Sequence, residues 1–265
     1  MNAADAGNTR TVGLIQEALD HGHFRVHYQP ILDPGGECFG FEALVRMEHP
    51  RAGRLAPLDF ISAAEDSGLI VPMGQWVLGE ACRQVSEWRS AGNANLRLSV
   101  NVSPIQLARP EWAATVIASL QRANLDPRAL ILEITETAIM SRWNEAFAQL
   151  EQLRGLGIEV GLDDFGTGYS SLSALYQLPV DYVKIDKSFT QRIGTEIRGA
   201  ALVNGIIQMA HQLGFRVVAE GVETAEQRAC LLRNNCDLLQ GYLLGRPLPA
   251  EEAGRLLLGN KSVCV

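Results

Sequence analysis

Strand-like and helix-like segments alternate along most of this chain, and that alternation limits its possible folds more than any other feature. Apolar runs of strand length start at six places, and a helix-like segment follows each of them. The six runs start at Leu96, Leu130, Glu159, Tyr182, Phe215 and Leu238. Repeated strand–helix units form parallel sheets, because each helix carries the chain back along a face of the sheet. No linker or change in composition interrupts the series, so we expect one domain.

Two further strands precede this series. Phe24–Ile31 and Cys38–Val45 have strand character, and the turn Pro34-Gly35-Gly36 between them predicts a hairpin. Helices are expected from Pro57 and from Gly74. Together with the six later units, the hairpin favours an α/β fold of the closed (β/α)8 barrel type. An open doubly wound sheet is the alternative, but no G-x-G-x-x-G motif follows the first strand.

The ends of the chain are expected to lie outside the barrel. We predict that residues 14–258 form the single barrel domain, with residues 1–13 as a flexible N-terminal segment and residues 259–265 as a C-terminal tail. The first eleven residues are polar and include Asp5, which does not suit a signal peptide. No apolar run approaches the ~20 residues that a membrane-spanning helix needs, so no membrane contact is expected through this domain.

Composition excludes several classes of partner. The 265 residues carry a net charge of −7, so no overall positive field attracts nucleic acid polymers or anionic membranes. The hydrophobic content of 47% indicates a globular protein with a substantial core. The chain has five cysteines without any C-x-x-C pair, which argues against a disulfide framework and suits the reducing cytoplasm.

The most unusual short motif is Asp163-Asp164, which ends the apolar run that starts at Ile158. Two carboxylates ~4 Å apart repel each other by about 4 kcal/mol at an effective dielectric constant of ~20. A proton, a basic side chain or a bound cation must relieve this repulsion. The following glycines, Gly166 and Gly168, let the backbone approach a ligand closely, and Tyr169-Ser170-Ser171 resembles a helix start. The structural alternative is a turn with two solvated aspartates.

Other strands also carry polar residues toward their carboxyl ends, where barrel enzymes have their active sites. Taken singly, Glu42 could pair with Arg46, Asn101 could cap a turn, and Lys184 could neutralise an aspartate. Together, five carboxylates and an amide are expected to converge on one rim beside a single lysine. Burying so many negative charges is unfavourable, and bound hard divalent cations are the natural way to compensate them. We therefore expect Mg²⁺ or Mn²⁺, as two ions ~3.5–4 Å apart of the kind that suits phosphoester hydrolysis. The expected metal ligands are Glu42, Asn101, Glu133, Asp163, Asp164 and Glu220.

Other chemistries lack support in the sequence. Neither the histidines nor the cysteines are taken to indicate zinc, and the five histidines are expected to form no cluster in the fold. The loop Gly166-Thr167-Gly168 is no Walker A loop, because no G-K-[ST] follows it. Adjacent acids would also repel a phosphate unless metal ions lay between them.

Eight short motifs, in order along the chain, identify a family. From about Leu14 to Leu258 the chain resembles the EAL-domain phosphodiesterases, which hydrolyse cyclic di-GMP. The motifs are Tyr28-Gln29-Pro30, Glu42-Ala43-Leu44, Asn101-Val102-Ser103, Glu133-Ile134-Thr135-Glu136, the stretch from Asp163 to Leu172, Lys184-Ile185-Asp186, Ala219-Glu220-Gly221-Val222-Glu223 and Gln240-Gly241-Tyr242. The resemblance implies a modified (β/α)8 TIM barrel with a reversed first strand. It also implies cleavage of one phosphodiester bond to give linear pGpG.

The resemblance further assigns roles to individual residues. Glu42, Asn101, Glu133 and Asp163 match the ligands of the first metal ion. Asp163 and Asp164 match those of the second, and Glu220 completes the network as ligand or general base. The implied catalytic residues are Glu42, Lys184 and Glu220, with Lys184 orienting the attacking water and offsetting phosphate charge. The implied substrate contacts are Gln29, Arg46, Lys184 and Gln240. Glu136 is similar to a residue that anchors the loop after Asp164, and Glu223 and Gln240 match supporting positions.

The resemblance also implies partners. Family members commonly form homodimers through the loop and helix after Asp164, and many are fused to sensory or cyclase domains. One position departs from the common pattern: Met47 replaces a tryptophan, which bears on how Arg46 is positioned. Two alternatives remain open, a catalytically silent cyclic di-GMP receptor and a different metal-dependent phosphodiesterase on a similar barrel.

Overall fold

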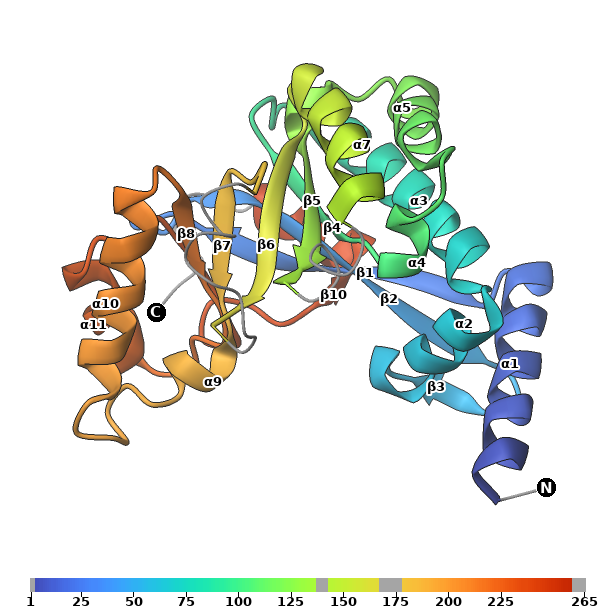
Figure 1. Ribbon diagram of the computed structural model, residues 1–265, viewed down its shortest axis with the longest axis horizontal. Coiled ribbons are helices and arrows are strands. Elements are labelled where there is room, and N and C mark those ends of the chain that lie inside the picture. Colours follow the sequence, from blue (N-terminus) through green and yellow to red (C-terminus); the bar gives the residue numbers. More distant parts are fainter. Residues whose placement is uncertain (1–2, 137–142, 167–177, 259–265) are drawn as a thin grey trace.

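A closed eight-stranded barrel forms the centre of the computed structural model, which describes residues 3–136, 143–166 and 178–258 (Figure 1). Each barrel strand pairs with two neighbours, and pairing between β1 and β2 closes the ring. In order around the barrel the strands are β1 (Phe24–Leu32), β2 (Cys38–His49), β4 (Arg97–Asn101), β5 (Leu130–Thr135), β6 (Glu159–Phe165), β7 (Tyr182–Ile185), β8 (Arg216–Ala219) and β9 (Leu238–Gln240).

The first strand runs against all the others. β1 pairs antiparallel with both β2 and β9, whereas the remaining pairs from β2 to β9 are parallel. The short turn between β1 and β2 explains the reversal, since a tight turn can join only antiparallel strands. In that turn Gly36 has a φ of 84° and donates its N–H to the carbonyl of Asp33 at 3.0 Å. The predicted modified (β/α)8 barrel with a reversed first strand is confirmed.

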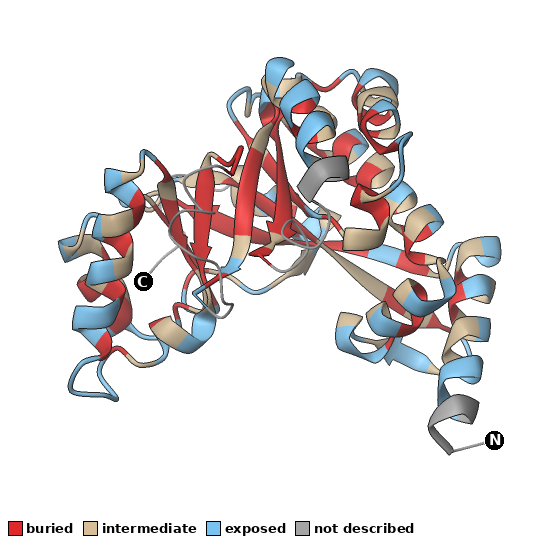
Figure 2. Cartoon of the chain, in the orientation of Figure 1, coloured by how far each residue is buried: buried red, intermediate tan, exposed pale blue. Residues whose placement is uncertain are grey.

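Amphipathic helices cover the outside of the barrel and bury its strands (Figure 2). Their apolar faces and the outward side chains of the strands form one large core, in which Leu98, Leu130 and Val183 have no exposed surface. No helix among the described residues is long and apolar enough to cross a membrane. The main covering helices are α3 (Ile70–Ser90), α5 (Trp112–Ala123), α7 (Trp143–Gly155), α10 (Gly199–Gln212), α11 (Ala225–Arg233) and α12 (Ala250–Leu258).

Several short elements were not predicted from the sequence. They are too short to show a repeating apolar pattern, so periodicity cannot reveal them. The tetrapeptide helix α4 is an example: Ser103 caps its first turn through a hydrogen bond from the N–H of Ile105. These elements are α4 (Pro104–Leu107), α9 (Lys187–Thr190), β10 (Leu248–Pro249) and the 3₁₀ turn η2 (Pro127–Ala129).

A small lobe projects from one side of the barrel (Figure 1, right). β2 extends beyond the barrel and pairs there with β3 (Gly53–Leu55). Around this extension lie α1 (Ala3–His21), η1 (Pro57–Asp59) and α2 (Ile61–Ser67). The lobe has its own apolar core, to which Ile15, Phe24, Met47, Phe60 and Met73 contribute. This arrangement gives Met47, the residue that departs from the family pattern, a fully buried position in the lobe core.

The first helix begins at Ala3 and so covers most of residues 1–13, for which the sequence predicted a flexible segment. Alanine has the highest helix propensity, and Ala3 opens an alanine-rich turn. Val12 and Leu14 pack against the lobe core, and Asn8 donates a hydrogen bond to Asp66 of α2 at 3.5 Å. Tertiary contacts with the lobe therefore support a helix whose polar start does not show the usual apolar pattern.

We expect Ile15→Ala to lower the free energy of unfolding by about 3 kcal/mol, because the change leaves a cavity at a fully buried site. Urea unfolding followed by circular dichroism measures the effect. The matched control is Gln16→Ala, on the exposed side of the same helix turn. Equal midpoints for the two variants would show that α1 contributes no packing to the lobe.

Candidate active site

Parallel pairing brings a set of polar side chains to one rim of the barrel. In the strand register Glu42 lies level with Ser99 of β4, and Asn101 lies level with Glu133 of β5. Asp163 lies level with Thr135, two residues beyond Glu133. The carboxyl ends of parallel barrel strands share one face, which is why residues far apart in sequence meet here. Glu42, Asn101, Glu133 and Asp163 therefore come from separate strands to one rim.

Lys184 lies at the centre of this rim. Its Nζ atom is 2.6 Å from Glu220 Oε1, 2.8 Å from Glu133 Oε2, 3.5 Å from Asp163 Oδ1 and 3.8 Å from Glu42 Oε2. Only 1% of the lysine side chain is exposed. Four carboxylates thus share one ammonium group. Its single positive charge is too small to neutralise all four of them.

The protonation behaviour of the cluster reflects this shortage. Burial raises the pKa of Glu133 well above its ordinary value, and the carboxylates of Glu42 and Asp163 add to the rise against the effect of Lys184. Burial likewise raises the pKa of Glu220 to about 7, although Lys184 opposes it. Burial disfavours the charge of Lys184, but the surrounding carboxylates, Asp163 first, outweigh it and raise the pKa of the lysine. Without further cations, protons must compensate the acids.

Two amide side chains hold Glu42. Asn101 Nδ2 donates to Oε1 at 2.7 Å, and Gln240 Nε2 donates to Oε2 at 2.6 Å. Gln240 is buried, and its Oε1 atom has no hydrogen-bond partner among the described residues. A buried acceptor without a donor suits a site that takes in water or a hydrated ion. Gln29, opposite Glu42 on β1, is also buried and donates to the carbonyl of Gly245 at 3.2 Å.

A β-bulge explains how two successive aspartates serve one site. Between β6 and β7, three residue steps from Leu162 to Phe165 face two steps from Val183 to Ile185, so β6 carries one extra residue. Asp164 there has a φ of 55°, and its N–H donates to Asp163 Oδ1 at 2.9 Å. Regular strands point successive side chains to opposite faces, but with the bulge both aspartates line the same cavity.

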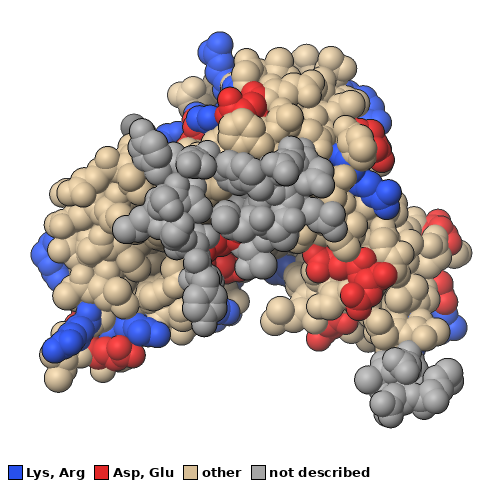
Figure 3. All heavy atoms as spheres, in the orientation of Figure 1, with Lys and Arg blue, Asp and Glu red and all other residues tan. Residues whose placement is uncertain are grey.

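That cavity has a volume of about 600 Å³ and opens beside the acidic rim. Its size is within the range of small-molecule sites. Glu133, Asp163 and Asp164 line one part of it, whereas apolar side chains of the lobe and of α3 line another. Figure 3 shows Asp and Glu atoms gathered on the lobe near the hollow between it and the rest of the molecule.

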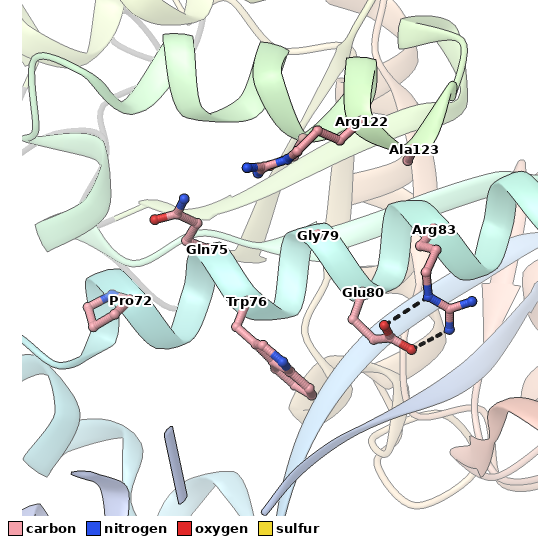
Figure 4. A pocket seen from close by; sticks show the side chains of 9 residues that line it. Pro72, Gln75, Trp76, Gly79, Glu80, Arg83, Arg122 and Ala123 are labelled. Carbon is pink, nitrogen blue, oxygen red and sulfur yellow. Dashed lines mark hydrogen bonds and ion pairs between the residues drawn. The ribbon is translucent and has the colours of Figure 1, made fainter. Parts of the chain in front are cut away.

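A second pocket, of about 500 Å³, lies on the outer face between α3 and α5 (Figure 4). Trp76 and Gln75 of α3 line it, and Arg122 of α5 extends toward Gln75. Within it Glu80 and Arg83 form an ion pair at 2.6 Å. None of the predicted site residues lines this pocket, so the barrel cavity is the candidate active site.

The donors on the rim fit hard divalent cations. All are carboxylate or amide oxygens, which Mg²⁺ and Mn²⁺ prefer. Among the described residues, no three His, Cys, Asp or Glu side chains are grouped closely enough to hold one ion as they stand, and four of the carboxylates surround Lys184 instead. Binding of ions therefore requires these carboxylates to turn from Lys184, which the excess of acids over cations favours.

Three histidines form a cluster away from this rim, whereas the sequence predicted no histidine cluster. The rings of His21 and His23 stack at 5.8 Å, and His23 meets the edge of His49 at 5.3 Å. The group lies in the lobe, where His49 bonds to Glu17 at 3.0 Å. The β1–β2 hairpin brings His49, at the end of β2, beside His23, although the two residues are far apart in sequence.

The remaining predicted residues are placed as follows. Arg46 is half-buried, and Glu136 is buried. Glu223 is exposed, and its backbone N–H donates to Gln227 Oε1 at 2.7 Å. The predicted helix start at residues 169–171 and the predicted dimer segment after Asp164 fall on residues 167–177, outside the described part of the chain.

Sequence reasoning missed Glu65, which lines the barrel cavity from α2. Glu65 belongs to a helix of the lobe, and no strand-end pattern or motif in the sequence indicated that this helix faces the acidic rim. Its Oε1 atom accepts a hydrogen bond from the hydroxyl of Ser103 at 2.7 Å. Ser103 lies two residues beyond Asn101, and this motif offered the only indirect signal.

Comparisons with known proteins agree with this geometry. MucR of Pseudomonas aeruginosa, a bifunctional diguanylate cyclase/cyclic di-GMP phosphodiesterase, is 42% identical over 253 residues, or 95% of this chain and 37% of MucR. The cyclic di-GMP phosphodiesterase PdeR of Escherichia coli is 42% identical over 89% of this chain and 36% of its own length. The chain thus spans about a third of these curated relatives.

Solved structures also resemble this chain in fold. The PaMucR phosphodiesterase in complex with c-di-GMP superposes with a TM-score of 0.88 at 42% identity, covering 92% of this chain and 99% of that one. The EAL enzyme Bd1971 with cAMP and cyclic di-GMP bound gives a TM-score of 0.91 at 28% identity, covering 97% and 70%. The sequence model of the EAL domain matches residues 14–247. This chain therefore belongs to the EAL domain family.

Proposed function

We propose that this domain is a metal-dependent phosphodiesterase that hydrolyses cyclic di-GMP to linear pGpG. The observation that carries the proposal is the convergence of Glu42, Glu133, Asp163 and Glu220 on Lys184, beside a cavity of about 600 Å³. The names of MucR and PdeR, which both include cyclic di-GMP phosphodiesterase, support this substrate. The c-di-GMP complex of the MucR phosphodiesterase supports it as well.

The proposed cofactors are two Mg²⁺ or Mn²⁺ ions. When bound, such ions lower the pKa of a water molecule and stabilise the charge of the departing oxygen. Glu42 is one of the residues proposed to hold these ions, and hydrogen bonds from the amides of Asn101 and Gln240 already orient its carboxylate. The residues proposed to hold the ions are Glu42, Asn101, Glu133, Asp163, Asp164 and Glu220.

In the reaction a water oxygen attacks one phosphorus atom, and the bond from that phosphorus to one ribose oxygen breaks, which opens the ring. Glu220 acts either as a ligand or as the acceptor of the water proton, a role that a carboxylate beside the attacking water can take. Lys184, 2.6 Å from Glu220, orients the water and offsets the charge of the phosphate. The departing ribose oxygen takes up a proton and becomes a hydroxyl.

Arg46 and Gln29 are proposed substrate contacts, Arg46 as a clamp on a phosphate. Gln240 was predicted among the substrate contacts, but its amide donates to Glu42, so we propose that it positions this carboxylate. Glu136 and Glu223 keep their proposed roles in support of the site. Homodimer formation after Asp164 and fusion to sensory or cyclase domains stay predictions, and the greater length of the relatives supports the second.

Incubation with cyclic di-GMP and Mg²⁺ or Mn²⁺ tests the proposed function, with products separated by liquid chromatography. We expect pGpG with either ion, none after treatment with EDTA, and recovery when the ion is added in excess. Tight binding of cyclic di-GMP by calorimetry without any pGpG would instead identify a silent receptor. Absence of both binding and turnover would exclude cyclic di-GMP as the substrate of this domain.

A further inference from the structure

One part of the active-site cavity differs in chemistry from the acidic rim. Its walls there come from α2, α3 and the η1 turn, and they are apolar: Leu58, Ile61, Met73 and Val77. Met73 is buried in the lobe core, whereas Leu58 is almost fully exposed at the mouth. Flat, apolar ligand groups suit such walls. A cyclic dinucleotide carries two groups of this kind, its bases, in addition to its charged phosphates.

Glu65 places one carboxylate among these apolar walls. The other acidic side chains that line the cavity, in the described part of the chain, are Glu133, Asp163 and Asp164, all at the acidic rim. Glu65 is half-buried on α2, opposite the β4–α4 turn. It therefore lies apart from the acids that surround Lys184.

The β4–α4 turn fixes the direction of the Glu65 carboxylate. The hydroxyl of Ser103 donates to Oε1 at 2.7 Å, and Ser103 is held in turn because its N–H donates to Gln106 Oε1 at 3.2 Å. Gln106 is buried against Gly74 of α3, where an added Cβ would lie 2.2 Å from its Nε2 atom. A side chain fixed in this way loses little entropy when a ligand binds, which strengthens recognition.

We propose that Glu65 recognises one guanine base of the substrate. This inference rests on the proposed function. The Watson–Crick edge of guanine presents two adjacent donors, N1–H and the N2 amino group, and a carboxylate offers only acceptors. Adenine presents an acceptor at N1 and would meet the carboxylate with repulsion. Glu65 thereby selects guanine dinucleotides, while the apolar walls hold the plane of the base.

Substrate analogues test the proposal. Cyclic di-IMP keeps N1–H and the carbonyl of guanine but lacks the N2 amino group, so wild-type protein should prefer cyclic di-GMP. We expect Glu65→Gln to lower kcat/KM for cyclic di-GMP roughly 10- to 100-fold, because a paired set of hydrogen bonds to a base edge is disrupted. The same change should affect cyclic di-IMP much less, so the preference between the two substrates should collapse.

The matched control is Asp66→Asn, which removes the same charge from the next, exposed position of α2 and should leave the preference unchanged. Ser103→Ala, which frees the carboxylate, should weaken the preference partly and serves if Glu65→Gln fails to fold. An equal loss on both substrates, or no loss, would overturn the proposal. Calorimetry with both dinucleotides measures the preference even if no turnover occurs, so failure of the proposed function remains distinguishable.

Discussion

Glu42→Gln is expected to lower kcat for cyclic di-GMP by roughly 10²- to 10⁴-fold, the range over which single acid–base or charge-stabilising groups act. The reason lies in the hydrogen bonds of Glu42. Both of its oxygens accept from amides, Asn101 at 2.7 Å and Gln240 at 2.6 Å. Glutamine keeps the shape of the side chain but replaces one acceptor oxygen with a donor, so the Gln240 or the Asn101 contact becomes a clash of donors. It also removes a negative charge that the proposed cations need.

The measurement is pGpG formation at saturating Mg²⁺ or Mn²⁺, with circular dichroism to show that the barrel is intact. Glu48→Gln on the same strand is the matched control, because Glu48 pairs with Arg25 and Arg54 in the lobe and takes no part in the rim. It should keep near wild-type turnover. Comparable rates for Glu42→Gln and Glu48→Gln would remove Glu42 from the proposed mechanism.

The strand–helix order and the β1–β2 hairpin could be predicted because they depend on local signals, whereas the reversal of the first strand was implied by the resemblance to the family. Apolar runs, helical periodicity and the Pro34-Gly35-Gly36 turn act over a few residues, and each was enough to define its element. The start of α1 at Ala3 could not be predicted in this way, because the contacts that support it, such as Asn8 with Asp66, join residues 58 positions apart.

The composition of the acidic rim was also predictable, since parallel strands of one barrel end on the same side. The side-chain contacts within the rim could not be predicted from the sequence. That Lys184 lies among four carboxylates, and that Gln240 donates a hydrogen bond to Glu42, depends on side-chain packing across the barrel. The bulge at Asp164 is a further case: the pair of aspartates suggested a site, but regular strand alternation would have sent them to opposite faces.

Glu65 shows the limit of such reasoning most clearly. A glutamate on a short helix has no strand-end pattern, and its place in the cavity arises only because the lobe folds over the barrel mouth. The acidic rim and the apolar part of the cavity therefore come from different layers of the structure. This division suits a ligand with a charged backbone and flat bases.

Lys184→Met is expected to have the largest effect on stability, since it leaves four carboxylates without their shared counter-charge. Removing one partner of a buried ion pair destabilises a protein by about 3–5 kcal/mol, and we expect a loss of this size in metal-free protein at pH 8. The pKa of Glu133 is already raised by burial, and loss of the ammonium raises it further. Groups with a raised folded-state pKa favour the folded state at low pH and lose that effect as the pH rises, so the deficit should shrink toward pH 5.5.

Divalent cations should restore part of the stability that Lys184→Met removes. Mg²⁺ bound only to the folded state adds stability that grows with its concentration, and the rim without its lysine attracts the ion more strongly, so millimolar Mg²⁺ should raise the melting temperature of the variant more than that of the wild type. Turnover should stay low, because the group that orients the attacking water is gone. Arg233→Met, at an exposed basic residue of α11, provides the control and should show neither effect. A Lys184→Met protein that matches the wild type in stability at pH 8 without metal, and responds no more to Mg²⁺, would show that the carboxylates do not depend on the ammonium.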